Sequence, residues 1–241
     1  ELILKTFSNN LVYKYCTPIV YGTRYILSHY AKLLEMPMPD VNIVKHSKDI
    51  KDGMLNIRQC SDERIEITPG TPSKEAGALA VSALELAVED IKEGLIENIL
   101  TAPIDKNTAV EAGLKHNGHT GFFAHEFESD VQMILLSEEQ KVAMVTGHTA
   151  LKDVSANLST EDILQTIERF ENSLKADFAI TKPKIAVLGM NPHSGDNGLM
   201  GTEEKDVIIP AIAKAKENGS MVIGPYPPDG FFGSKTSQQF D

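Results

Sequence analysis

The sequence predicts an α/β fold with a largely parallel sheet covered by helices. Short apolar segments alternate along the chain with longer segments whose apolar residues recur at helical spacing. Glycine or proline stands at several of the boundaries between these segments. The chain shows no internal repeat and no low-complexity tract, so the alternation indicates a globular protein.

The elements before residue 115 begin with a helix-like segment, ELILKTF at 1–7. The apolar run TPIVY at 17–21 predicts a strand, and the spacing of apolar residues after it predicts a helix over 23–34. A segment rich in alanine and leucine, with Pro72-Ser73 just before it, predicts a long helix over 74–95. The other expected elements here are strands over 40–44 and 98–101 and a helix over 106–112.

The elements after residue 115 continue the alternation. Apolar runs at 131–136 and 142–146 predict neighbouring strands. The segment KIAVL at 184–188 predicts a buried strand. The other expected elements are helices over 122–127, 160–175 and 203–218 and a strand over 221–224.

Length and composition fit one large domain or two ordinary ones: 241 residues, of which 41% are hydrophobic and 24% charged. The formal net charge of −11 and the near absence of basic runs exclude a nucleic-acid-binding surface, because neutralising phosphates requires clustered lysine and arginine. A small phosphorylated ligand is still compatible with this charge.

No apolar run approaches the roughly 20 residues of a membrane helix. With no secretory signal, we expect a cytoplasmic protein whose two cysteines are reduced.

Lys106 is the first candidate for chemistry. It stands in LTAPIDK, where a predicted strand runs into a helix. Open α/β sheets hold ligands beyond the carboxyl ends of their strands, which favours a functional lysine here. A strand–helix turn with a solvated lysine is the simpler interpretation of this segment taken alone.

His119 and Thr120, in NGHTGFF, form a second candidate group. Thr120 is placed to cap the helix expected over 122–127. A hydroxyl beside an imidazole is also suited to holding a phosphate or a carboxylate. His116 and His125 lie nearby in the sequence, but nothing in their setting separates them from surface residues.

Two further histidines, His148 and His193, each follow an apolar strand at the same relative place. One histidine at a strand end is usually a surface residue, but two at equivalent ends of one parallel sheet would reach the same edge. Imidazole is a common metal ligand, and a site with few protein ligands leaves positions for substrate. The pair therefore predicts a metal site.

The loop around His193 reads GMNPHSGDNGLMGTEE. Its glycines permit unusual backbone conformations and close approach to a ligand. Glu203 and Glu204 fall in the first turn of the expected helix, where the helix dipole favours acids, and we interpret them in that way. Asp229, in GPYPPDGFF, is either a turn residue or a further acid near the site.

Together these segments resemble the 4-hydroxythreonine-4-phosphate dehydrogenases of vitamin B6 biosynthesis. The matching stretches are LTAPIDK with EAGL, then GHT, the His148 segment, LGMNPHSGDNGLMGTEEKDVIIPAI and GPYPPDGFF, in the order of that family. They span about 100–232, and the fourth stretch is long and specific.

Gly121 is a departure from the family's pattern, because the family usually has glutamate after GHT. The family's opening GDP-x-GIGPE segment and its later YHDQG segment are also not found in the sequence. We therefore expect the 241 residues to belong to a longer chain.

The resemblance implies a fold like that of the isocitrate and isopropylmalate dehydrogenases, with two α/β domains and a cleft between them. We assign residues 1–114 to the first domain, which a further C-terminal segment would complete. We assign residues 115–241 to the second domain, with the metal and substrate residues. The resemblance also implies a homodimer with the metal site at the subunit interface.

The implied reaction is metal-dependent oxidation of 4-hydroxythreonine 4-phosphate by NAD or NADP. It gives a 2-amino-3-oxo acid phosphate that decarboxylates to 3-amino-2-oxopropyl phosphate. The family holds its cofactor without a G-x-G-x-x-G fingerprint, and the chain contains none. Zinc suits histidine ligation, and magnesium, manganese or cobalt also suits a partly open site.

The resemblance assigns roles residue by residue. His148 and His193 match two metal ligands, with the third, in YHDQG, expected from the partner subunit. His119 and Thr120 match substrate-binding residues. The lower-ranked candidates for electrostatics or proton transfer are Lys106 and Asp229.

Three alternatives stay open at this point. Gly121 is compatible with a related dehydrogenase acting on erythronate or threonate 4-phosphate. Phosphate acyltransferases share a related fold but need no metal histidines. A non-catalytic binding protein or paralogue is the third alternative.

Overall fold

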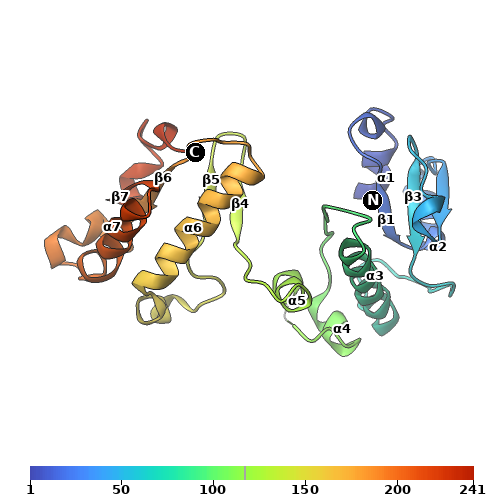
Figure 1. Ribbon diagram of the computed structural model, residues 1–241. Helices are drawn as coiled ribbons and strands as arrows, with labels where there is room; N and C mark the ends of the chain where they lie inside the picture. The colour runs from blue at the N-terminus through green and yellow to red at the C-terminus, as the bar shows by residue number, and fades with distance from the viewer. Residues whose placement is uncertain (117) are drawn as a thin grey trace. The chain divides into compact units, whose positions relative to one another are not determined.

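The computed structural model describes residues 1–116 and 118–241, which form two compact units, 1–131 and 132–241 (Figure 1). Asn117, the first residue of the NGHTGFF segment, lies outside the described residues. Both units mix helices and strands, which confirms the predicted α/β class. The domain break expected after residue 114 stays a prediction.

The first unit contains a three-stranded parallel sheet in the order β1-β3-β2. Two helices contribute apolar side chains to the core of this sheet, where Leu4, Leu55 and Ile57 are fully buried. The elements are α1 (Leu2–Phe7), β1 (Ile19–Gly22), α2 (Arg24–Leu33), β2 (Val41–Val44) and β3 (Leu55–Gln59).

Three more helices of the first unit enclose a second apolar cluster. Val81, Leu84 and Val88 of α3 pack there with Ala109 of α4 and Phe122 of α5. The helices are α3 (Lys74–Lys92), α4 (Lys106–Glu111) and α5 (His119–Glu126). The lysine and histidine candidates of this unit therefore stand at the first residues of two helices fixed by one core.

In the first unit one strand was missed and one strand prediction is wrong. The central strand, β3, was not expected, because Asn56 and Arg58 interrupt its apolar pattern. Asn56 is fully buried, and its side-chain oxygen accepts hydrogen bonds from the Asn42 amide (2.9 Å) and the Lys51 backbone N–H (3.0 Å). Conversely, residues 98–101 form no strand, and Leu100 is fully exposed. An apolar run becomes a strand only where a neighbouring strand pairs with it.

The second unit contains two strand pairs. β4 and β5 pair antiparallel, whereas β6 and β7 pair parallel. The helix expected over 203–218 is a π-helical turn at Glu204–Ile208 followed by α7. The other elements are β4 (Ile134–Leu136), β5 (Lys141–Ala143), α6 (Thr160–Ala176), β6 (Lys184–Leu188), α7 (Ile209–Glu217), β7 (Met221–Tyr226) and α8 (Pro228–Phe231).

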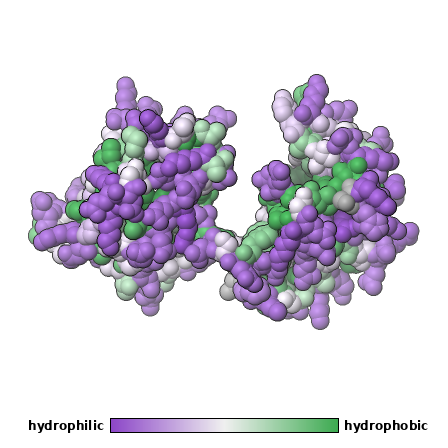
Figure 2. All heavy atoms as spheres, viewed as in Figure 1, coloured by the Kyte–Doolittle hydropathy of each residue, from purple (hydrophilic) through white to green (hydrophobic). Residues whose placement is uncertain are grey.

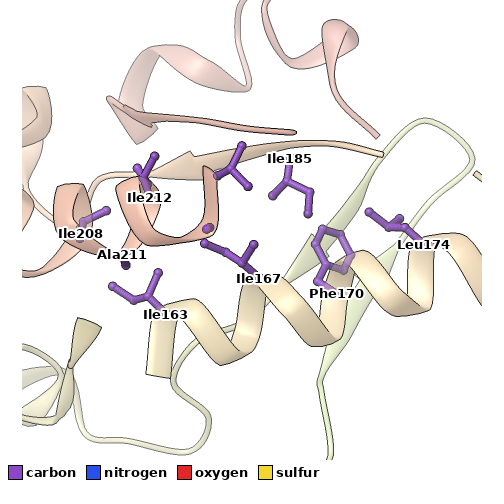
Figure 3. Close-up of a cluster of buried hydrophobic side chains, with 10 residues drawn as sticks. Ile163, Ile167, Phe170, Leu174, Ile185, Ile208, Ala211 and Ile212 are labelled. Atoms are coloured by element: carbon purple, nitrogen blue, oxygen red, sulfur yellow. The ribbon is translucent and has the colours of Figure 1, made fainter. Parts of the chain in front are cut away.

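The core of the second unit lies between α6, α7 and the β6–β7 pair (Figure 3). The buried residues of α6 recur every three or four positions, as expected for one face of a helix. Figure 3 shows this face, with Ile163, Ile167 and Phe170, turned toward Ile185 and Ile212. This packing fixes the start of α7 and the end of β6, and the loop that joins them carries His193.

Hydrophilic residues cover most of the face drawn in Figure 2, with smaller hydrophobic areas between them. Over residues 1–116 and 118–241, no helix combines the length and apolar character needed to cross a membrane.

Candidate metal and substrate site

The loop between β6 and α7 contains a left-handed turn. The φ angles of His193, Ser194, Asp196 and Asn197 lie between 42° and 56°, and Gly195 has φ 79°. For residues other than glycine this conformation costs about 1–2 kcal/mol each, with aspartate and asparagine tolerating it best. A run of such residues persists only where the surrounding structure holds it.

The side chain of Glu204 holds this loop from the inside. Glu204 is only 4% exposed. Its carboxylate accepts hydrogen bonds from the backbone N–H groups of Met190 (2.8 Å) and Asn191 (2.7 Å) and from the Asn191 side-chain amide (2.9 Å). A Cβ at Gly195 would lie 2.7 Å from one Glu204 oxygen. The glycine is therefore required by this close approach as well as by its φ angle.

Electrostatics keep the Glu204 carboxylate charged. Burial alone would raise the pKa of Glu204, but hydrogen bonds from Asn191 and Met190 outweigh burial and hold that pKa below its usual value. The interpretation of Glu203 and Glu204 as acids that only start a helix is therefore incomplete. They do stand at the start of the π-helical turn, and their carboxylates also bind the preceding loop.

Glu203 connects this loop to the segment that follows His148. Its carboxylate accepts hydrogen bonds from the Asn191 side-chain amide (2.8 Å) and from the Ser155 hydroxyl (2.5 Å). The hydrogen bond from Ser155 is the main cause that lowers the pKa of Glu203. The segments carrying the two candidate metal histidines are thus joined through one carboxylate.

His193 itself lies beside Asp229. The distance from His193 Nδ1 to Asp229 Oδ2 is 3.3 Å, and both side chains are more than half exposed. A carboxylate at Nδ1 favours the tautomer with hydrogen on that nitrogen, which leaves the Nε2 lone pair free. Metal-binding histidines have this arrangement. Asp229 lies in the first turn of α8 and beside His193, and its role as an acid of the site stays a prediction.

His148 matches His193 in backbone position. His148 follows the last residue of β5, Ala143, by 148 − 143 = 5 positions, and His193 follows the last residue of β6, Leu188, by 193 − 188 = 5. Their φ angles are 52° and 51°. The expectation that both follow strands of one parallel sheet is wrong, because β5 pairs antiparallel with β4 and β6 pairs with β7.

The two strands are nevertheless close. Residues of β5, β6 and α6 line one pocket of about 330 Å³. Across the described parts of the chain, no three histidine, cysteine, aspartate or glutamate side chains gather closely enough to hold a metal ion. His148 and His193 thus stay candidate metal ligands, with a carboxylate 3.3 Å from Nδ1 of His193, and a further ligand would have to come from elsewhere.

In the first unit, Lys106, His119 and Thr120 gather at the beginning of α5. Lys106 begins α4, and its Cε lies 3.6 Å from where a Cβ on Gly118 would stand. The prediction that Thr120 caps α5 is wrong, since Gly118, with φ 93°, is the N-cap, and within residues 1–116 and 118–241 no side chain caps the helix. The N-terminus of a helix beside a lysine stem is suited to an anion.

His119 is the first residue of α5 and is half-buried. This burial lowers the pKa of its imidazole, so the ring is neutral at neutral pH. A neutral imidazole donates or accepts a hydrogen bond without adding charge. The positive charge available to a ligand here comes from Lys106 and the helix N-terminus.

Gly121 has a packing explanation that the sequence did not reveal. A Cβ at position 121 would lie 3.1 Å from the Cβ of His116. The His116 ring also packs on the His125 ring, with centroids 4.7 Å apart. The two histidines that looked like isolated surface residues thus form a pair, and His116 occupies the space beside α5 that a side chain at 121 would use.

Comparison with known proteins places these features in one family. Residues 14–241 match the family described as "Pyridoxal phosphate biosynthetic protein PdxA". A 4-hydroxythreonine-4-phosphate dehydrogenase of Bacteroides thetaiotaomicron is 37% identical, and the match covers 100% of this chain and 66% of that protein. The chain thus spans just under two thirds of that relative's length.

Solved structures give the same result. A 4-hydroxythreonine-4-phosphate dehydrogenase from Burkholderia phymatum is similar with a TM-score of 0.84 and 30% identity, covering 100% of this chain and 73% of that one. One from Klebsiella pneumoniae is similar with a TM-score of 0.80 and 31% identity, covering 92% and 70%.

The contact between Gly195 and Glu204 predicts a specific stability difference. Gly195→Ala and Gly219→Ala both place alanine at positive φ, but a Cβ at Gly219 meets nothing within 4 Å. We expect Gly219→Ala to lower the free energy of unfolding by about 1–2 kcal/mol. Gly195→Ala should cost about 1–3 kcal/mol more, because the methyl group displaces the carboxylate. Urea denaturation of both variants measures this difference, and equal losses would show that Glu204 does not occupy that space in solution.

Proposed function

Because the chain belongs to the PdxA family of pyridoxal phosphate biosynthetic proteins, we propose that it oxidises 4-hydroxythreonine 4-phosphate with NAD or NADP and a divalent metal. The observation that carries the proposal is that Nδ1 of the His193 imidazole lies 3.3 Å from Oδ2 of Asp229. His148 stands at the matching place after a neighbouring strand. Two histidines, one of them with a carboxylate beside Nδ1, are suited to binding the metal on which such a hydroxy-acid oxidation relies.

His148 and His193 are the proposed metal ligands. Asp229 acts through His193, because its carboxylate keeps hydrogen on Nδ1 and so frees Nε2 for the metal. When bound, the metal supplies Lewis acidity toward the hydroxyl that is oxidised. Zinc is the best match to histidine ligands, while magnesium, manganese and cobalt also suit a partly open site. We propose that a second copy of the chain supplies the third ligand, which makes the working protein a homodimer.

The phosphate of the substrate is the proposed ligand of the first unit. Lys106 and the N-terminus of α5 provide positive potential there, and Thr120 provides a hydroxyl. Neutral His119 contributes a directional hydrogen bond rather than charge. These groups bind and orient the substrate, so Lys106 supplies electrostatic attraction.

The reaction balances as follows. A bound nicotinamide cofactor would accept hydride from the carbon that bears the hydroxyl, and the hydroxyl proton would pass to solvent. The resulting 2-amino-3-oxo acid phosphate would lose carbon dioxide, as β-keto acids do, and take up a proton at the same carbon to give 3-amino-2-oxopropyl phosphate. Free thiols at Cys16 and Cys60 are in keeping with a cytoplasmic location for this chemistry.

A second candidate substrate class follows from Gly121. Gly121 lies in the first turn of α5, and the His116 side chain fills the space beside it. An imidazole at this place alters the hydrogen bonding offered to a substrate. Erythronate 4-phosphate and threonate 4-phosphate, which carry a hydroxyl in place of the amino group, are therefore the alternative substrates.

Substrate choice is decided by measuring nicotinamide reduction with each compound under the same conditions. We expect kcat/KM for 4-hydroxythreonine 4-phosphate to exceed that for either sugar-acid phosphate by at least about ten-fold, which is roughly 1.4 kcal/mol of discrimination. The opposite order would assign the protein to the alternative class. No reduction with any of the three would contradict the proposed chemistry as a whole.

Metal ligation is tested with His148→Ala and His193→Ala, using His46→Ala, an exposed histidine of the first unit, as the matched control. Each ligand variant should lose bound metal and turnover by more than the roughly 10–100-fold that loss of an outer hydrogen-bond partner costs. His46→Ala should keep both. Elemental analysis after dialysis, together with kcat, measures the effect, and full metal content in His193→Ala would rule out its role as a ligand.

A further inference from the structure

We propose that Ser155, Asn191, Glu203 and Glu204, here called the loop clamp, form a positioning group that sets the geometry of His148 and His193 toward a metal. The inference rests on the proposed function and goes beyond it, because none of the four side chains is a metal ligand or touches substrate in that proposal. They act through the two loops that carry the histidines.

The clamp maintains an unusual backbone conformation. Residues 193–197 all have left-handed backbone angles, a run that is unfavourable in a free chain. Glu204 faces this turn from a buried position and holds the residues just before it, Met190 and Asn191, through their backbone N–H groups. Asn191 also begins the turn, because its backbone carbonyl accepts a hydrogen bond from the backbone N–H of Ser194. The direction of the His193 side chain is therefore set by this anchored backbone.

The clamp also spans both histidine segments. Asn191 donates through one amide group to Glu203 (2.8 Å) and to Glu204 (2.9 Å). Glu203 also accepts from Ser155, seven positions after His148 by 155 − 148 = 7. Because β5 and β6 share no ladder of hydrogen bonds, these side chains supply a polar link between the two loops that the sheets do not.

A buried carboxylate of this kind costs free energy unless both of its oxygens accept hydrogen bonds. One Glu204 oxygen accepts two backbone N–H groups and the other accepts the Asn191 amide. Asn191 is thus tied at both its backbone and its side chain to one carboxylate. The core of the unit is apolar where α6 and α7 pack, so we attribute the charged group at this place to its control of the loop.

Two variants test the clamp in the native protein, with Co²⁺ alone as the probe. Glu204→Gln keeps the side-chain volume but turns an amide toward the Asn191 amide, so that two donors face each other. Ser155→Ala removes an exposed hydroxyl and only the link to Glu203, so it is expected to fold normally. Glu217→Gln, an exposed glutamate at the end of α7, is the matched control.

Three quantities are measured for each protein: Co²⁺ affinity, the visible absorption spectrum of the Co²⁺-loaded protein, and amide hydrogen exchange of residues 190–197 without metal. We expect both clamp variants to bind Co²⁺ about 10–100-fold more weakly, with an altered spectrum, as for other outer partners of metal ligands. Exchange in 190–197 should be faster in Glu204→Gln, and the control should match the wild type in all three.

Each outcome bears on a separate claim. Faster exchange with unchanged affinity and spectrum would make the clamp a purely structural feature and overturn the proposal. Unchanged exchange in Glu204→Gln would show that the carboxylate does not hold the turn, which overturns it as well. A wild-type protein that binds no Co²⁺ would refute the proposed function itself, whereas normal wild-type binding with unaffected variants would refute only the clamp.

Discussion

The buried carboxylate of Glu204 is the interaction on which the candidate site of the second unit depends. It binds the residues before His193 through two backbone N–H groups and the side chain of Asn191, and it leaves no room for a side chain at Gly195. The left-handed turn that follows would be costly without such an anchor. Because the turn sets where His193 points, the pairing of His193 with Asp229 follows from it.

Much of the fold was predictable because its elements obey local rules. The helix over 160–176 has one apolar face, and the segment 184–188 is a short apolar run that pairs with β7. The two errors about strands in the first unit have one cause, which is that strand pairing is not local. β3 is the central strand of its sheet although Asn56 makes it look polar, and 98–101 forms no strand although it looks apolar.

The site was predictable to the extent that residue type carries chemistry. His148 and His193 were identified from their equal places after two strands, and that equivalence extends to the same left-handed φ angle. The contacts that hold the candidate residues in place were not predictable, because they depend on the conformation of the loops in three dimensions. Glu204 looked like an acid favoured by a helix dipole, and His116 like a surface residue, until the structure placed one against Gly195 and the other against Gly121.

The most direct test of the central claim is a crystal structure of the native protein with zinc, located by anomalous scattering. The account predicts zinc bonded to Nε2 of His193 at about 2.0–2.1 Å. Nδ1 of His193 should still lie beside the Asp229 carboxylate. Residues 193–197 should keep positive φ angles, with the Glu204 carboxylate still packed against their turn. Zinc bonded through Nδ1, or a loop that is no longer left-handed with Glu204 turned away, would contradict it.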